Sequence, residues 1–355
     1  MSVVMPAYNC ERYVLESASS ILRQTISDLE LIVVDDCSTD RTADMLAGLC
    51  DPRLKVLRAA RHQGQTACIN LGLAAARGVY VARQDADDIA TPSRLKMQAR
   101  FLDEHPGTMM VGSSGWTVDA SGGAPRPMRR QTNPLAIRWG LLFGTALTNL
   151  MWRRDWVARN VGQFSLQMSY AEDYDFVARV ASVSHVANLP ARLMMYRRHP
   201  DAIGVAHREG EDAAAQRVCL RQLSSLMGTE PASPIAWIRA IGLSAPESVP
   251  AREMPGVMAA FGAVHDCFES WAAELPYVRR TDLMVVRRTA GRSMGVAIAS
   301  ACRRGVGGSS LAAALGWRNS AVLDAAEEMS RVCLRRLRRM TLHGLGPSSV
   351  RHPRN

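Results

Sequence analysis

Three aspartates, Asp85, Asp87 and Asp88, lie within four positions in the stretch "ARQDADDIATP". Carboxylates this close repel one another unless a positive group lies among them. A hard divalent cation is the expected partner, and Mg²⁺ usually takes one or two carboxylates together with phosphate oxygens of a substrate. Residues two apart on an extended segment point to the same side. We therefore expect Asp85 and Asp87 to share one ligand and Asp88 to turn elsewhere and hold the loop.

Taken alone, the same pattern also fits solvated acids of an ordinary turn, because a D-x-D tripeptide has little specificity. Its position is more informative. The preceding residues 79–83, "VYVAR", are rich in β-forming side chains and predict a strand that ends at the aspartates. In an open parallel sheet, ligands bind outside the carboxyl ends of the strands. This rule makes the loop after each expected strand a candidate part of the site.

The first hundred residues alternate short β-rich runs with helical periods, which is the pattern of a parallel sheet covered by helices. Strands are expected at residues 2–5, 29–36, 54–60 and 79–83. Helices are expected from about residue 11, after residue 40, over 65–76 and from Pro92. The run at 29–36 is apolar before its final acids, as interior parallel strands are.

The loops after these four strands carry polar and aromatic residues that we expect to converge on one crevice. They are Pro6, Ala7, Tyr8 and Asn9 after the first strand, Asp35 and Asp36 after the second, Arg61 after the third, and Asp85, Asp87 and Asp88 after the fourth. No G-x-G-x-x-G follows the first strand and no P-loop sequence occurs. Neither a dinucleotide fingerprint nor a P-loop is therefore supported.

The rest of the chain has two different characters. Extended segments are expected at 108–119, 146–152 and 185–200, a helix at 172–182, and a loop rich in Gly, Pro and Arg at 120–134. From Glu209 onward the chain is rich in Ala, Leu, Met and Arg and predicts a separate helical domain. We therefore divide the chain into residues 1–118, 119–208 and 209–355.

The composition, 47% hydrophobic and 21% charged, is that of a globular protein and excludes a disordered or fibrous chain. A formal net charge of +10 favours partners with phosphates or an anionic membrane surface. The eight cysteines include no C-x-x-C pair, so neither a zinc knuckle nor a disulfide framework is indicated. Without a signal-peptide pattern or an apolar run of about 20 residues, we expect a cytoplasmic protein.

The basic stretch at 330–340, "SRVCLRRLRRM", predicts a partly amphipathic helix. Such a helix can lie on an anionic membrane and would give a peripheral contact at its inner face. A solvated face of a helical bundle explains the same pattern equally well.

Five stretches, in matching order and spacing, make the chain similar to glycosyltransferase family 2, whose members have the GT-A fold of nucleotide-diphospho-sugar transferases. They are "SVVMPAYN-x-E", "QT-x-x-DLELIVVDDCSTDRT", the run from Gly64 that ends in "ARQDADDIATPSRL", "AEDYDF" and "YRRHP". The resemblance covers about residues 1–205. It implies an α/β fold with a Rossmann-like, mostly parallel sheet and helices on both faces, followed here by an all-α C-terminal domain. Residues 1–118 would be the nucleotide-sugar half and 119–208 the acceptor half.

The resemblance implies roles on the donor side one residue at a time. Pro6, Ala7, Tyr8 and Asp36 resemble a nucleotide-base pocket, with the Tyr8 ring available for stacking, and Arg61, Asn9 and Glu11 are further candidates for this part of the site. Asp85 resembles an acid that contacts ribose or metal, Asp87 resembles a metal ligand, and Asp88 fits either role. The cofactor implied is Mn²⁺ or Mg²⁺.

On the other side of the site, Asp173 resembles the catalytic base, and Glu172 is a weaker candidate because neighbours on a helix face different ways. Acids that favour a helix N-terminus are the alternative explanation for both. His199 resembles a contact to the metal and diphosphate, with a structural or surface role as the alternative. Arg197 or Arg198 could pair with phosphate, and one of the two could equally be structural.

Two departures from the family pattern limit what can be carried over. His62 stands where Asn is frequent, and Leu147, Thr148 and Asn149 stand where His-Pro-Ser/Thr is frequent. We therefore assign no acceptor contact to Leu147, Thr148 or Asn149 from the family resemblance. Relatives usually have several residues before the first strand, which leaves open whether the true N-terminus lies upstream of Met1.

The resemblance implies inverting, metal-dependent transfer of a sugar from a nucleotide-diphospho-sugar to an acceptor hydroxyl in polysaccharide, glycolipid or other glycoconjugate synthesis. UDP is the first candidate nucleotide, with dTDP and GDP open; the acceptor is a saccharide or a lipid-linked sugar, and no nucleic-acid partner is expected. One alternative is a catalytically inactive member that acts as a binding or scaffold subunit. Another is a sugar-phosphate nucleotidyltransferase, but "MPAYNCER" lacks the G-x-G-[ST]-R segment of that class.

Overall fold

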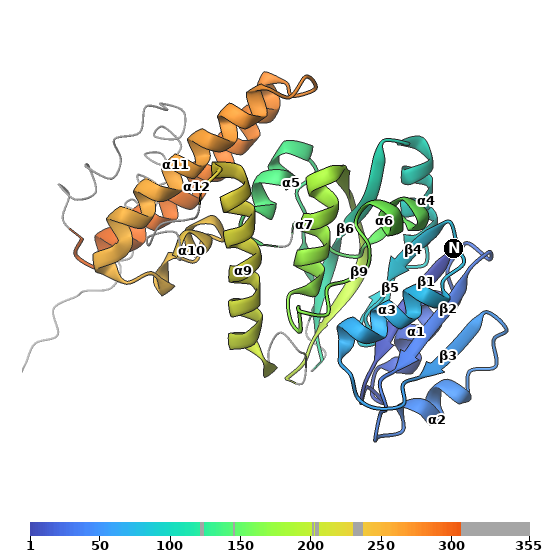
Figure 1. Cartoon of the computed structure of the whole chain (residues 1–355). Helices are drawn as coiled ribbons and strands as arrows, with labels where there is room; N and C mark the ends of the chain where they lie inside the picture. Colours follow the sequence, from blue (N-terminus) through green and yellow to red (C-terminus); the bar gives the residue numbers. More distant parts are fainter. Residues whose placement is uncertain (121–123, 145, 201, 203–205, 230–236, 307–355) are drawn as a thin grey trace, which may run out of the picture. The chain divides into compact units, whose positions relative to one another are not determined.

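The strands expected in the first hundred residues all lie in one mixed sheet in the computed structural model (Figure 1). Residues 1–120, 124–144, 146–200, 202, 206–229 and 237–306 are described by this structure. Their strands are β1 (Ser2–Ala7), β2 (Glu30–Asp35), β3 (Leu54–Arg58), β4 (Tyr80–Arg83), β5 (Ile89–Ala90), β6 (Thr108–Asp119), β7 (Arg126–Met128), β8 (Met151–Arg153) and β9 (His185–Arg198). Within the described ranges these nine strands form a single sheet.

The strand order is β3-β2-β1-β4-β8-β6-β9-β5, with β7 added alongside β6. The pairs β3–β2, β2–β1, β1–β4 and β6–β9 are parallel, and the pairs β4–β8, β5–β9, β6–β7 and β6–β8 are antiparallel. After β1 the chain forms β2 and β3 on one side and then returns to place β4 on the other side. This reversal next to β1 is a switch point, where open α/β sheets form their ligand crevice.

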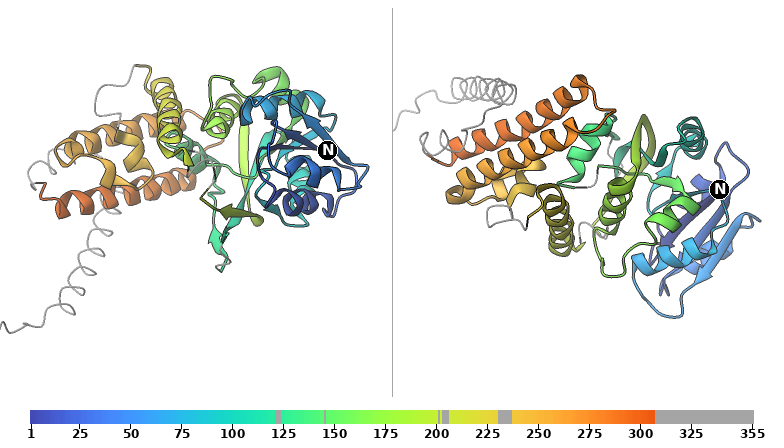
Figure 2. Two further views of the ribbon diagram at one scale, coloured as in Figure 1. Left: turned by 90° about the horizontal axis from the view of Figure 1, so that it is seen from below. Right: turned by 45° about the horizontal axis from the view of Figure 1, so that its top comes forward.

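Helices cover both faces of the sheet, as Figures 1 and 2 show. They are α1 (Val14–Leu22), α2 (Thr42–Ala47), α3 (Gln65–Ala75), α4 (Arg94–Glu104), α5 (Pro134–Leu141), α6 (Arg154–Asn160) and α7 (Glu172–Val183). The next helix, α9 (Arg208–Met227), adds Ala214, Ala215 and Val218 to the hydrophobic cluster that contains residues of α5 and α7. Side chains alternate along β1, so Val3 and Met5 pack with α1, α2 and α4, while Val4 packs with α3, α5 and α7. The expected α/β fold with helices on both faces is confirmed.

The chain divides into two compact units, residues 1–225 and 226–355. In the second unit, the described helices are α10 (Ile238–Gly242), α11 (Met254–Ala273) and α12 (Arg280–Arg303), with short 3₁₀ turns at Pro246–Ser248 and Ala251–Glu253. Helix α9, expected to open the C-terminal domain, belongs to the first unit through residue 225. The subdivision of the first unit at residue 118 stays a proposal, and the basic stretch 330–340 lies outside the described residues.

Several local expectations differ from the structure. The segment 120–134, expected to be a loop, contains β7, because Arg126–Met128 pairs with the long strand β6. The extended segment 146–152 is reduced to β8. Helix α4 begins at Arg94 and not at Pro92, because the backbone and hydroxyl of Thr91 donate hydrogen bonds to the Leu193 carbonyl in β9. In the described ranges, no helix is long and apolar enough to cross a bilayer.

Candidate active site

A cavity of about 800 Å³ opens at the carboxyl ends of β1, β2 and β4. Most of the residues selected from the sequence line it, although they come from distant parts of the chain. The candidates on its wall are Pro6, Ala7, Tyr8, Asn9, Glu11, Asp36, Asp85, Asp87, Asp88, Glu172, Asp173, Arg197 and His199. Arg61 and Arg198 are exposed and are not among the lining residues. Asp35, also selected from the sequence, is buried, pairs with Arg58 at 3.4 Å and is not a lining residue either. The sheet therefore brings together the expected set, apart from Asp35, Arg61 and Arg198.

The Tyr8 end of the cavity has an aromatic surface. The Tyr8 ring is 45% exposed and lies 4.2 Å, centroid to centroid, from the His62 ring. His62 Nδ1 is 2.9 Å from Asp36 Oδ2. The buried Asp36 carboxylate also accepts the backbone N–H groups of Gln63 and Gly64, at 2.9 and 2.8 Å. Asp36 thus holds the loop after β3 in place, where Gly64 has a φ of +89°, a value that suits glycine.

Asn9 and Glu11 act locally on the loop after β2. The Asn9 side-chain oxygen accepts the Thr39 backbone N–H at 2.9 Å, and Asn9 itself has a φ of +47°. Glu11 Oε2 pairs with Arg41 at 3.3 Å, and the Glu11 N–H donates to Asp40. Both side chains therefore fasten one loop of the cavity to its neighbour in the described structure.

The segment after β4 forms a turn at Ala86 and Asp87, so the expectation of an extended segment is wrong. Asp85 and Asp87 still line the same cavity. Asp88 is buried and accepts the Arg197 backbone N–H at 2.9 Å, which ties the turn to β9. Sequence periodicity could not anticipate the turn, because it is closed by a hydrogen bond from the Asp88 N–H to the Asp85 carbonyl and by the contact with β9.

Asp87 and His199 meet across the cavity. His199 Nε2 lies 3.0 Å from Asp87 Oδ2. Burial and the neighbouring Asp85 raise the pKa of Asp87, and His199 opposes this rise. Burial and Asp87 raise the pKa of Asp88 well above its usual value. The cavity thus concentrates carboxylates whose mutual repulsion a cation would relieve.

Among the lining side chains, His199 has a ring nitrogen that bears on the binding of a divalent cation. The buried Nδ1 atom of His199 has no hydrogen-bond partner among the described residues, and it carries a lone pair if Nε2 donates to Asp87. No group of three His, Cys, Asp or Glu side chains in the described ranges is arranged to hold a metal by itself. Of the residues expected to hold a cation, Asp85, Asp87 and His199 all line the cavity.

Of the two adjacent arginines, Arg197 faces the cavity and Arg198 does not. Arg197 Nε donates to the Asp87 carbonyl at 2.9 Å, and its Nη2 pairs with Glu16 at 2.6 Å. Its guanidinium carbon also lies 4.8 Å from the centroid of the Tyr13 ring. Alternation along β9 sends the two side chains to opposite sides.

The first turn of α7 carries Glu172 and Asp173 into the cavity wall. Ala171, just before the helix, has a φ of +53°, and its N–H donates to Glu211 in α9 at 3.2 Å. A left-handed alanine is a strained conformation of the kind that clusters at functional sites. The Asp173 carboxylate accepts the Tyr174 backbone N–H at 2.6 Å, while Glu172 turns toward Arg83. The two acids therefore have different surroundings.

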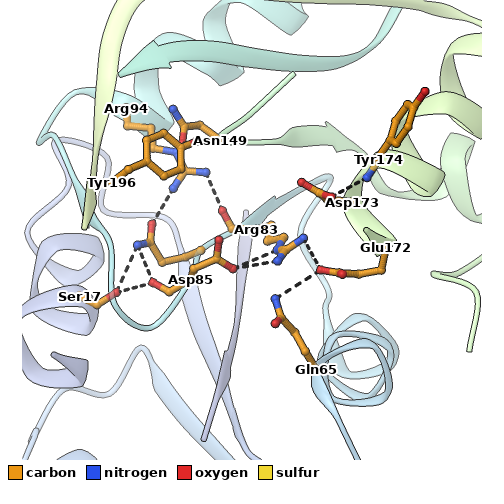
Figure 3. A network of polar contacts seen from close by, with 11 residues as sticks. Ser17, Gln65, Arg83, Asp85, Arg94, Asn149, Glu172, Asp173, Tyr174 and Tyr196 are labelled. Carbon is orange, nitrogen blue, oxygen red and sulfur yellow. Dashed lines mark hydrogen bonds and ion pairs between the residues drawn. The ribbon is translucent and has the colours of Figure 1, made fainter. Parts of the chain in front are cut away.

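A buried polar network behind the aspartates was not foreseen from the sequence (Figure 3). Arg94 is fully buried and donates to Gln84 Oε1 and to the Arg83 carbonyl, both at 2.7 Å. Gln84 in turn donates to the carbonyls of Asp85 and Asp88, at 3.0 and 2.8 Å. Burial lowers the pKa of Arg94 to about 10. The network fixes the backbone of the turn at Asp85–Asp88. The sequence feature that could have indicated it is the presence of two arginines, Arg83 and Arg94, in segments that are otherwise expected to be buried.

We expect the free energy of unfolding of the ligand-free protein to fall as the pH rises from about 4.5 to about 7. Burial raises the pKa of Glu172 to about 7, against an opposing effect of Arg83. The folded state therefore binds this proton more tightly than the unfolded chain does, and the stabilisation is lost as the pH passes the folded pKa. A loss of roughly 1–3 kcal/mol is expected from this group.

The measurement is thermal or urea unfolding at pH 5 and pH 7.5 for wild type, Glu172→Gln and the control Glu104→Gln. Glu104 is an exposed partner of Arg100. Glu172→Gln should show a flatter pH profile than the other two proteins. An unchanged profile in Glu172→Gln would show that another group causes the dependence.

Known proteins resemble this chain in sequence and in fold. The chain matches the family described as Glycosyl transferase family 2 over residues 2–171. It is 31% identical over 230 residues to an uncharacterized glycosyltransferase of Haemophilus influenzae, a match that covers 61% of this chain and 71% of the relative. In several other curated glycosyltransferases, the match spans half of their own length or less.

Two solved structures show the same fold. One is TarS 1-349 of S. aureus in complex with UDP-GlcNAc, with a TM-score of 0.55 and 21% identity over 86% of this chain and 91% of that chain. The other is the mannosyltransferase PcManGT of Pyrobaculum calidifontis in complex with GDP-Man and Mn²⁺, with a TM-score of 0.51 and 17% identity over 85% and 86%. The family match ends at residue 171, so Glu172, Asp173 and His199 lie beyond it.

Proposed function

This chain belongs to glycosyltransferase family 2 and is a transferase enzyme of the GT-A fold, and on that premise we propose that it transfers a sugar from a nucleotide-diphospho-sugar to an acceptor hydroxyl. The proposal includes inversion at the anomeric carbon and dependence on Mn²⁺ or Mg²⁺. It also includes a role in polysaccharide, glycolipid or other glycoconjugate synthesis at a cytoplasmic location.

One observation carries the proposal: a single cavity joins an aromatic end, a carboxylate and imidazole cluster, and an acid at the start of a helix. Tyr8 and His62 offer ring faces to a nucleotide base. Asp85, Asp87 and His199 suit a diphosphate that is bound together with a cation. Asp173 stands at the start of α7, on the segment between β8 and β9. These three groups are of the kinds that suit the base, the diphosphate and the acceptor hydroxyl in such a reaction.

In the proposed mechanism, Asp173 accepts the proton of the acceptor hydroxyl as its oxygen attacks the anomeric carbon. General-base assistance of this kind typically contributes 10²–10⁴-fold to the rate. The nucleoside diphosphate leaves from the opposite side of that carbon. A cation held by Asp85, Asp87 and His199 would supply neutralisation of the negative charge on the leaving diphosphate. Glu172, which is paired with Arg83, is not assigned the base role.

A UDP-sugar is the first candidate donor, and a GDP-sugar the second. Two proteins with the same fold support this choice, because one was solved with UDP-GlcNAc and the other with GDP-Man and Mn²⁺. The acceptor is proposed to be a hydroxyl of a saccharide or of a lipid-linked sugar.

A thermal-shift screen tests the donor proposal. UDP, UDP-GlcNAc, GDP and GDP-mannose, each with and without Mn²⁺, are added to the full chain. Binding to the folded state raises the melting temperature in proportion to RT ln(1 + [L]/Kd), about 2.7 kcal/mol at a hundredfold excess over Kd. We expect a clear rise for one nucleotide series, dependent on Mn²⁺. If none of the compounds shifts the melting temperature, the proposed donor class is wrong.

Turnover of the bound donor separates the enzyme from an inactive binding subunit. Release of the nucleoside diphosphate from the stabilising nucleotide-sugar, with Mn²⁺ and water as the acceptor, is measured by coupled assay. Binding without any release over hours would favour the binding or scaffold subunit.

A further inference from the structure

Arg83 lies between two carboxylates of the cavity wall, one from the segment after β4 and one from the start of α7 (Figure 3). Its Nε and Nη2 atoms are 3.1 and 3.0 Å from Asp85 Oδ1, and its Nη1 atom is 3.0 Å from Glu172 Oε1. The side chain is 10% exposed, and that of Glu172 is 11% exposed. A single guanidinium thus links the end of β4 to the first turn of α7.

Stability alone is a weak reason for this arrangement. A buried ion pair contributes little net stability, because the cost of desolvating both charges offsets their attraction. Arg83 occupies the last position of β4, where its carbonyl accepts a hydrogen bond from the buried Arg94. The guanidinium therefore extends from a firmly held backbone, and it can set the position of a side chain on another element.

The two acids at the start of α7, Glu172 and Asp173, have different partners. Glu172 Oε1 is engaged by Arg83 and, at 3.4 Å, by the side-chain amide of Gln65 in α3. Asp173 instead accepts the N–H of Tyr174, within its own helix. Holding Glu172 therefore orients the turn that carries Asp173 without a direct contact to the Asp173 carboxylate.

We propose that Arg83 is a positioning residue that ties Asp85 to Glu172 and thereby sets the place of Asp173 relative to the donor. This inference rests on the proposed function, because it assumes that the donor binds beside Asp85 and that Asp173 is the base. A planar guanidinium suits the task, since its fork can engage two carboxylates at once, whereas a lysine ammonium acts as a point charge.

The kinetic test is a double-mutant cycle with Arg83→Gln, Glu172→Gln and the double variant, assayed for Mn²⁺-dependent hydrolysis of UDP-GlcNAc or GDP-mannose. We expect each single variant to lower kcat about 30- to 100-fold, with donor KM changed less than fivefold in Glu172→Gln, which leaves the Arg83–Asp85 pair in place. Because both residues act through one link, the double variant should be no more than threefold slower than Arg83→Gln. Multiplication of the two single effects would overturn the proposal.

Two further variants control the cycle. Arg83→Lys keeps the charge and should lie between wild type and Arg83→Gln, and it serves if Arg83→Gln does not fold. Arg100→Gln removes a partner of an exposed ion pair with Glu104, and it should retain wild-type kcat. If Arg83→Lys and Glu172→Gln both retain wild-type kcat, Arg83 does not position the base.

A measurement without substrate keeps the inference separate from the proposed function. Amide hydrogen exchange of peptides covering residues 171–178 should be faster in Arg83→Gln and in Glu172→Gln than in wild type and Arg100→Gln. Unchanged exchange in both variants would overturn the link, whatever the turnover. If the two variants exchange faster but the wild-type protein neither binds nor hydrolyses a nucleotide-sugar, the link between Arg83 and Glu172 stands and the proposed function is refuted instead.

Discussion

Replacing Asp173 by Asn is expected to lower the rate of sugar transfer by roughly 10²–10⁴-fold, the range that a general base supplies. Asn keeps the shape of the side chain and can still accept the Tyr174 N–H that Asp173 accepts at 2.6 Å. It cannot take up the proton of the acceptor hydroxyl. Binding of the nucleotide-sugar should stay nearly intact, because the donor contacts assigned above come from other residues.

The measurement pairs kcat for Mn²⁺-dependent donor hydrolysis with the thermal shift produced by the same donor. Asp155→Asn is the matched control, since Asp155 is an exposed acid paired with Arg154 outside the cavity. Near-normal turnover in Asp173→Asn would remove Asp173 from the base role. Loss of both turnover and donor binding would instead indicate that Asp173 contributes to binding.

Replacing Asp87 by Asn should weaken Mn²⁺-dependent binding of the donor by about 100-fold, equivalent to about 2.7 kcal/mol. The physical reason is the loss of a negative charge beside Asp85 and His199, the other groups that suit the cation. Burial and Asp85 raise the pKa of Asp87, so the ligand-free protein also loses a repulsive carboxylate in this variant. Its melting temperature without ligand should therefore be preserved or raised near neutral pH.

Titration of the donor in the presence and absence of Mn²⁺, by calorimetry or thermal shift, measures this effect. Asp44→Asn, at an exposed position of α2 outside the cavity wall, provides the control. If Mn²⁺ strengthens donor binding equally in Asp87→Asn and in wild type, the cation is held elsewhere. A ligand-free melting temperature that collapses in the variant would point to a structural role for Asp87.

The pKa shifts of Asp87, Asp88 and Glu172 share one direction and one main cause. Burial raises all three, and for the two aspartates a neighbouring carboxylate adds to the rise. Burial and neighbouring carboxylates therefore favour the protonated form of these three groups in the cavity. Arg83, Arg94 and Arg197 are placed around this cluster and hold its backbone and side chains. Destabilised sites of this kind are typical of active sites.

Much of the first unit could be predicted from local pattern. Short β-rich runs predict strands, so β1, β2, β3 and β4 lie where the sequence placed them, with ends within a few residues. β1, β2 and β4 are largely buried, whereas β3 is an edge strand without a buried residue. The rule that ligands bind at carboxyl ends of strands then selected Tyr8, Asp36 and the aspartates after β4, all of which line the cavity. The reason is that such residues lie next to the strands that position them.

The errors arose where distant segments meet. β7 forms because β6 is long enough to offer it an edge, and α4 starts late because Thr91 is bound to β9. Arg61, selected by the same strand-end rule, is exposed outside the cavity wall. A rule based on the end of a strand cannot tell how far along the following loop the chain turns away.

By itself, the sequence determined the kind of fold, the edge of the sheet that carries the site, and the chemistry of a carboxylate cluster beside an aromatic pocket. These follow from residue type and short-range spacing. Only the tertiary structure decided that Arg197 and not Arg198 faces the cavity, that Asp88 ties the turn to β9, and that Arg83 joins Asp85 to Glu172. Each of these depends on strands and helices about a hundred residues apart in sequence coming within hydrogen-bond distance, which packing and not local spacing controls.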